Sequence, residues 1–105
     1  MARTPEGRVK DAVVKVLKEF GVYYFMPIGG AFTKIGISDI VCCYNGSFIA
    51  IECKAGKNTP TALQEREIRL IKEAGGIALV VNETNLNDVR ITLEEINHER
   101  RLRDS

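Results

Sequence analysis

The spacing of apolar residues over the first twenty positions predicts an amphipathic helix. Thr4 is a favourable N-cap, Pro5 suits the first helical position, and Gly21 ends the pattern. Between these ends, apolar side chains recur every three or four residues: Val9, Ala12, Val13, Val16, Leu17 and Phe20. Such spacing is typical of a helix that packs one face against a core.

The next part of the chain has the pattern of strands and turns. Val22–Met26 is a β-branched and aromatic run, typical of a strand, and a glycine-containing loop follows it. Two further strands, at residues 38–44 and 47–55, are joined by Asn45-Gly46, the strongest short signal for a β-hairpin. The sequence therefore predicts three strands in succession.

The last part predicts a helix, a strand and a helix. Thr61–Gln64 is a capping box and opens a helix that ends near Ala74. Ile77–Val81 is fully apolar, which predicts a buried central strand. A second capping box, Thr92–Glu95, predicts the start of a last helix that frays into residues 100–105. The expected fold is α/β, in the order α-β-β-β-α-β with a C-terminal helix, as one domain over residues 1–105 with a mixed central sheet.

Composition limits the class of protein. A chain that is 45% apolar and 28% charged is typical of a globular protein. It has neither an apolar run of the ~20 residues that span a bilayer nor a signal-peptide pattern, so we expect a cytosolic protein with no membrane partner. Three cysteines, Cys42, Cys43 and Cys53, fall in predicted strands, and we expect them to be reduced core thiols.

Charged residues interrupt both strands of the predicted hairpin, at positions that lie opposite each other. A two-residue turn at Asn45-Gly46 sets Asp39 opposite Glu52 on one sheet face, with Cβ atoms ~4.5–5.5 Å apart. Lys54, two residues further, shares that face. Opposed carboxylates destabilise a sheet unless a positive group lies between them, and their oxygens suit Mg²⁺ or Mn²⁺. The alternative is an ordinary exposed network of Glu and Lys side chains.

Two polar residues on the predicted helices point toward the same core. Glu6 lies at the N-terminal end of the apolar stripe of the first helix, and Gln64 lies on the face of Ile68 and Ile71. Each also has a simpler interpretation. Glu6 can interact with the helix dipole, and Gln64 can bond back within the capping box. Glu67 falls near the same stripe, and the pattern gives it no role.

The segments GISD, IECKAG, TALQ and AGGIALVV together resemble the VRR-NUC branch of the PD-(D/E)XK nuclease superfamily. The resemblance covers about residues 5–82 and departs at Ser38, where the family usually has Pro. It implies a restriction-endonuclease-like core and metal-dependent hydrolysis of DNA phosphodiester bonds. Mg²⁺ is the implied cofactor, and Mn²⁺ is its usual substitute.

The same resemblance implies roles for individual residues. Asp39, Glu52 and the backbone carbonyl of Cys53 would ligate the metal. Lys54 would orient the attacking water or help to deprotonate it, and would stabilise charge on the phosphate. Gln64 would position the water or Lys54, while Glu6 would reach the metal through water. The implied catalytic set is Glu6, Asp39, Glu52, Lys54 and Gln64.

The expected partner is DNA that contains branches or junctions. Residues 1–72 carry eleven Lys or Arg against seven Asp or Glu, a balance that favours a polyanion, although a solvated helix face explains scattered lysines equally well. Lys34, Lys57 and Arg8 flank the predicted site in sequence and are the predicted phosphate contacts. A minimal domain of this kind resembles Holliday-junction resolvases, with flap or end processing as the alternative.

A homodimer is also expected, because a four-way junction is two-fold symmetric and its resolution needs paired cuts. Apolar residues in or beside residues 27–35 would form the interface: Tyr23, Phe25, Met26 and Phe32. The alternative is that these residues close the core of a single chain. Two further alternatives to the enzyme remain, a metal-free DNA-binding module and a catalytically inactive relative of the nucleases.

Overall fold

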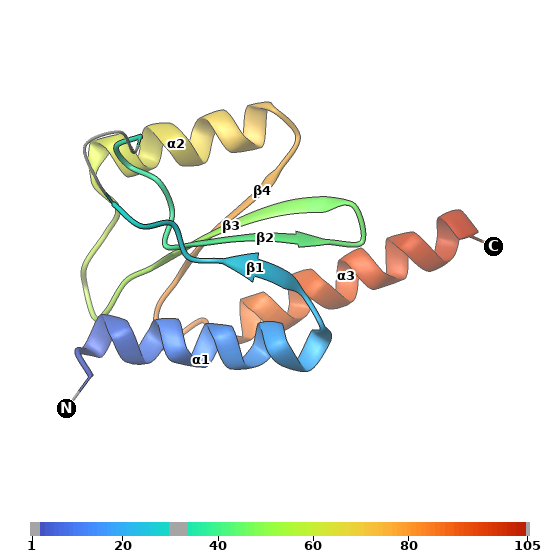
Figure 1. Cartoon of the computed structure of the whole chain (residues 1–105), viewed down its shortest axis with the longest axis horizontal. Coiled ribbons are helices and arrows are strands. Elements are labelled where there is room, and N and C mark those ends of the chain that lie inside the picture. Colours follow the sequence, from blue (N-terminus) through green and yellow to red (C-terminus); the bar gives the residue numbers. More distant parts are fainter. Residues whose placement is uncertain (1–2, 30–33, 105) are drawn as a thin grey trace.

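The computed structural model describes residues 3–29 and 34–104. Within these residues it contains three helices and four strands in the order α-β-β-β-α-β-α, so the predicted α/β class and element order are confirmed (Figure 1). None of the described helices is both long enough and apolar enough to cross a membrane. The elements are α1 (Pro5–Phe20), β1 (Tyr23–Phe25), β2 (Ile40–Tyr44), β3 (Ser47–Cys53), α2 (Ala62–Glu73), β4 (Ile77–Val81) and α3 (Asn87–Asp104).

The four strands form one mixed sheet in the order β1-β2-β3-β4. Strands β1, β2 and β3 pair antiparallel, and β3 pairs parallel with β4. Within the described residues β4 is therefore an edge strand, and only Val81 of its five residues is buried, so the prediction of a central, buried strand is wrong. A short apolar run does not distinguish the two positions, because helices that pack on the faces of β4 call for apolar side chains whether or not a further strand pairs with its edge.

Helices cover both faces of the sheet. Figure 1 shows α2 on one face, with α1 and α3 on the other. The main core lies on the α1 and α3 face, where alternate residues of β2 and β3 meet the apolar stripes of the two helices. Its largest fully buried side chains include Leu17, Ile40, Ile49, Ile51, Val81 and Leu93.

Local signals that the sequence carries set the ends of several elements. The Thr4 hydroxyl accepts a hydrogen bond of 3.0 Å from the N–H of Gly7, and Gly21 caps α1 in the left-handed conformation with φ of 70°. In the hairpin turn, Asn45 and Gly46 both have positive φ, 49° and 84°. These values are those of the turn that follows the twist of a hairpin. The predicted hairpin is thus confirmed.

The start of α3 corrects a prediction. The helix begins at Asn87, so Thr92 lies inside it and does not cap it. The preceding turn leads into the helix, because the N–H groups of Asp88 and Val89 donate to the carbonyls of Asn85 (2.9 Å) and Leu86 (3.2 Å). The side-chain oxygen of Asn85 also accepts from the N–H of Asn82 (2.7 Å), which holds this turn together. The helix also continues to Asp104, where fraying was expected.

The cysteines are all free, and two of them are buried. Cys42 and Cys53 belong to the core, whereas Cys43 is exposed on the opposite face of the sheet. The expectation of a core thiol is therefore wrong for Cys43, because adjacent residues of a strand point to opposite faces.

Candidate active site

The hairpin brings Asp39 and Glu52 to the same end of the sheet. All five residue pairs between β2 and β3 follow the predicted register. Asp39 directly precedes β2, and its Oδ2 accepts a hydrogen bond of 2.8 Å from the N–H of Cys53. This bond fixes the Asp39 carboxylate beside the end of β3, next to Glu52.

The Glu52 carboxylate is buried on the α2 side of the site, with 2% of the residue exposed. Its Oε1 accepts a hydrogen bond from Gln64, whereas its Oε2 is fully buried and has no hydrogen-bond partner among the described residues. Burial, and after it the neighbouring Asp39 carboxylate, raise the pKa of Glu52, Lys54 lowers it in part, and the net result is a pKa of about 7. A buried acceptor of this kind is destabilising unless a proton or a cation satisfies it.

Gln64 serves the helix and the site at the same time. Its side-chain oxygen accepts from the N–H of Thr61 (2.9 Å), and the Thr61 hydroxyl accepts from the N–H of Gln64 (3.2 Å), which completes the predicted capping box. The amide nitrogen of the same side chain donates to Glu52 Oε1 at 2.8 Å. Gln64 therefore both caps the helix and contacts the site. The capping box orients its amide toward Asp39 and Glu52, which are called the acid pair below.

Each acid of the pair also has a lysine near it. Lys54 Nζ lies 3.6 Å from Glu52 Oε1, and the backbone N–H of Lys54 donates to Val81 of β4 at 2.9 Å. Lys10 Nζ, on α1, lies 3.7 Å from Asp39 Oδ1. Both separations are longer than a hydrogen bond. Lys10 is partly exposed and can turn toward an additional anion with little loss, whereas Lys54 is mostly buried, and its movement away would leave the Glu52 carboxylate without its positive partner.

Glu6 and the Cys53 thiol lie close to this group. The Glu6 side chain is partly buried in the first turn of α1 and contributes to a raised pKa of the Cys53 thiol. Burial is the main cause of that shift, followed by Asp39, and together they raise the Cys53 pKa to about 12. The thiol is thus neutral and belongs to the core, so a metal role for Cys53 would rest on its backbone carbonyl, as the resemblance implies.

The acid pair fits a hard divalent cation. Residues 3–29 and 34–104 include no group of three or more Asp, Glu, His or Cys side chains that could hold a metal ion. Mg²⁺, however, is usually held by one or two carboxylates together with substrate phosphates and water. Glu52 interacts with the neighbouring Asp39 carboxylate, and its Oε2 has no hydrogen-bond partner among the described residues, so it can serve as an oxygen ligand for such an ion.

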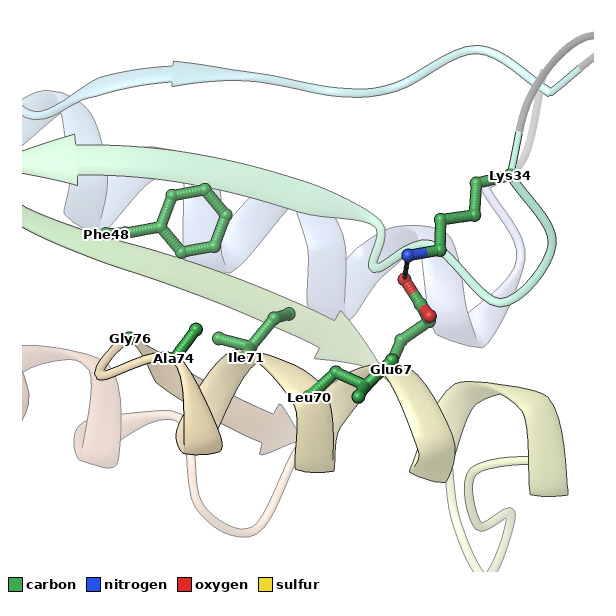
Figure 2. Close-up of a pocket in the computed structure, with 7 residues that line it drawn as sticks. All are labelled: Lys34, Phe48, Glu67, Leu70, Ile71, Ala74 and Gly76. Carbon is green, nitrogen blue, oxygen red and sulfur yellow. Dashed lines mark ion pairs between the residues drawn. The ribbon is translucent and has the colours of Figure 1, made fainter.

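The three predicted phosphate contacts occupy different surroundings. Arg8 and Lys57 are exposed, Arg8 on α1 and Lys57 in the link between β3 and α2. Lys34 lies directly before the turn that leads to Asp39, and its ammonium group forms an ion pair of 3.1 Å with Glu67 of α2 (Figure 2). Lys34 and Glu67 stand at one end of an apolar hollow of about 350 Å³ between α2 and the sheet. That hollow contains neither acid of the candidate site.

Two residues were not predicted for this region. Lys10 follows Glu6 by one helical turn, so its position on the face toward the site is a signal that the sequence carries. Glu67 follows Gln64 by three residues, on the same side of α2. Its partner Lys34 is distant in sequence, and no local pattern connects them.

No protein-family model matches this sequence, and no curated protein matches it. The resemblance to VRR-NUC nucleases therefore rests on the short segments of the sequence and stays a prediction.

Proposed function

We propose that this protein is a divalent-metal-dependent, structure-specific deoxyribonuclease of the VRR-NUC type, which hydrolyses phosphodiester bonds in branched DNA. The observation that carries the proposal is the buried Glu52 carboxylate beside Asp39, with one oxygen lacking a hydrogen-bond partner among the described residues. A purely structural role gives no reason to bury an acid at this end of the sheet, beside a second carboxylate. A catalytic metal site does.

Asp39, Glu52 and the Cys53 carbonyl would hold Mg²⁺, or Mn²⁺ in its place. When bound, the ion would acidify a water molecule and offset negative charge on the phosphoryl oxygens. With all five side chains ionised, Glu6, Asp39, Glu52, Lys10 and Lys54 carry a net formal charge of −1. Because the pKa of Glu52 is about 7, a divalent cation would bind in place of the proton that this carboxylate holds near neutral pH. Glu6 would contact the hydrated ion from α1.

The remaining side chains of the site would orient the reaction. Lys54 is close enough to Glu52 to reach a phosphate or water bound at the pair, where its charge would stabilise the transition state. Gln64 holds Glu52 Oε1 and thereby keeps Oε2 directed away from the capping box. Lys10 adds a second positive charge, on the Asp39 side.

Arg8 and Lys57 would contact DNA phosphates beside the site. Lys34 would contact a phosphate only if its ammonium group left the ion pair with Glu67 or bound both groups at once. Binding through phosphates is insensitive to base sequence and weakens steeply as salt rises. The reducing cytosol suits the three unpaired cysteines. A base-specific or salt-insensitive affinity would count against this assignment.

A homodimer would present two such sites to a two-fold symmetric DNA junction. Tyr23, Phe25 and Met26 lie at the β1 edge of the sheet and are exposed, Tyr23 to 71%. Phe32, the fourth predicted interface residue, lies outside the described residues. Burial of this edge against a second copy would remove apolar surface from water. Sedimentation equilibrium at micromolar protein tests the dimer, and a monomer mass would favour flap or end processing.

The competing function is a metal-free DNA-binding module, including an inactive relative of the nucleases. Thermal unfolding with increasing Mg²⁺ separates the two, because only a metal site gains stability from the ion. We expect wild-type protein to be stabilised by millimolar Mg²⁺ and Glu52→Gln to be unaffected. Cleavage of junction, flap, duplex and single-stranded DNA then identifies the preferred substrate. Stabilisation without cleavage of any of these would indicate an inactive relative.

A further inference from the structure

The segment that leads into Asp39 is docked on α2. Residues 34–38 precede Asp39, and Lys34 reaches from this segment to Glu67 on the helix (Figure 2). A hollow between the sheet and α2 is lined both by Ile37 and Ser38 of the segment and by Glu67 of the helix. The segment and the helix therefore face each other along several residues, beyond the one ion pair.

Gly36 makes the closest approach between the two parts. A Cβ atom at Gly36 would lie 2.6 Å from the carbonyl oxygen of Leu63 and 3.2 Å from the backbone nitrogen of Gln64. The glycine also has φ of 84°, in the left-handed region. The backbone of the segment thus rests against the turn of α2 that carries Gln64, and a side chain at this position would force them apart.

Glu67, about one helical turn after Gln64, forms a second contact between α2 and the segment through its ion pair with Lys34. The residue is 8% exposed and lines two hollows that are otherwise mostly apolar, with Phe48 and Ile71 beside it. A buried carboxylate destabilises its surroundings unless a charge or a hydrogen bond compensates. Lys34 provides that charge at 3.1 Å. Release of the segment would leave the Glu67 charge buried, so the ion pair opposes release.

We propose that Lys34, Gly36 and Glu67 are positioning residues that dock the Asp39 segment on α2. The helix then sets both acids of the pair, because Gln64 holds Glu52 directly and the docked segment fixes Asp39. The catalytic consequence of this docking rests on the nuclease function proposed above. The docking itself is a property of the folded chain and can be measured without DNA.

Two matched glycine variants test the close approach. Gly36 and Gly46 both have φ of 84°, yet a Cβ at Gly46 meets nothing within 4 Å. Gly46→Ala therefore controls for backbone strain alone. The NMR signals of the Cys53 amide and of the Gln64 side-chain amide report the contacts to Asp39 and Glu52. We expect both signals to move in Gly36→Ala and to stay in place in Gly46→Ala. Unmoved signals in a folded Gly36→Ala protein would overturn the proposal.

Charge variants keep the proposal testable if Gly36→Ala does not fold. Lys34→Met and Glu67→Gln each break the ion pair and keep side-chain size. Glu73→Gln is the control, because it breaks the exposed Arg69–Glu73 pair on the same helix. We expect amide exchange of Cys53, whose N–H donates to Asp39, to accelerate about 10-fold or more in the first two variants only, since opening of the docked segment would release that bond. Equal exchange in all three would contradict the docking.

Kinetics distinguish positioning from direct DNA contact at Lys34. A positioning role predicts that Lys34→Met and Glu67→Gln both lower kcat, about 100-fold for a displacement of an ångström, with KM little changed. A phosphate contact predicts weaker DNA binding in Lys34→Met and tighter binding in Glu67→Gln, which would reject positioning. If the wild type cuts no DNA and the NMR signals still respond, the docking stands and the nuclease function fails.

Discussion

The two faces of the sheet differ in how completely they are covered. On the α1 and α3 face, two helices enclose side chains such as Leu17, Ile40 and Ile51, which are fully buried. On the α2 face, one helix covers only part of the sheet. Phe48 remains 47% exposed there, while two carboxylates, Glu52 and Glu67, are buried. Apolar burial is thus concentrated on one face, and buried charge on the other.

Under the proposed function, this difference would separate stability from function within a small protein. A single core supplies most of the stability in a chain of about 100 residues, and the α1 and α3 face holds that core. The α2 face can then carry groups that destabilise the fold by themselves, such as an unpaired carboxylate oxygen. Active sites have this character, because perturbed acids are what their chemistry uses.

The largest expected effect contrasts apolar truncations on the two faces. Leu17→Ala removes a fully buried side chain from the enclosed core and should destabilise the fold by about 3–5 kcal/mol. Phe48→Ala on the α2 face should lower stability by about 1 kcal/mol, because nearly half of that side chain already meets water. Urea denaturation of both variants measures the difference. Equal losses would mean that the two faces contribute alike.

An intermediate effect comes from the buried acid. The pKa of Glu52 is raised from 4.5 to about 7, so the folded chain binds this proton more tightly than the unfolded chain. In the metal-free protein, the contribution of Glu52 to stability should therefore be fully present below about pH 4.5 and fall by about 3 kcal/mol as pH rises to 7, at ~1.4 kcal/mol per pKa unit. Glu52→Gln should remove most of this slope. Glu95 is exposed on α3, so the control variant Glu95→Gln should keep the same dependence of stability on pH as wild type.

The smallest expected effect is the stability lost when a helix cap is removed. It is tested at the two Thr-x-x-Glu/Gln sequences of the chain. Thr61 caps α2 and orients Gln64, so Thr61→Ala should lower stability by about 1 kcal/mol and shift the Gln64 side-chain NMR signal. Thr92 lies inside α3, and Thr92→Ala should change stability by less than about 0.5 kcal/mol. A loss in Thr92→Ala as large as that in Thr61→Ala would restore the predicted cap at Thr92.

The sequence predicts the features that depend on local geometry. A two-residue turn at Asn45-Gly46 fixes the register of the hairpin, and that register alone places Asp39 beside Glu52. The capping box likewise fixes the backbone role of Gln64. Both features follow from a few neighbouring residues, which explains why they could be derived before the structure.

Features that depend on distant contacts could not be derived in this way. The Lys34–Glu67 pair joins residues from separate elements, and the edge position of β4 depends on the order of all four strands. The start of α3 depends on which of two overlapping signals prevails, and the asparagine turn outweighs Thr92. In each case a local pattern was compatible with more than one tertiary arrangement.

The most direct test of the central claim is DNA cleavage by three proteins in Mg²⁺ and in EDTA: wild type, Lys54→Ala and the control Lys72→Ala on the exposed end of α2. We predict that wild type and Lys72→Ala cut branched DNA in Mg²⁺ and fail in EDTA. Lys54→Ala should still bind DNA but cut about 10²–10³-fold more slowly, because it removes charge stabilisation at the acid pair. Undiminished cleavage by Lys54→Ala, or by wild type in EDTA, would contradict the account.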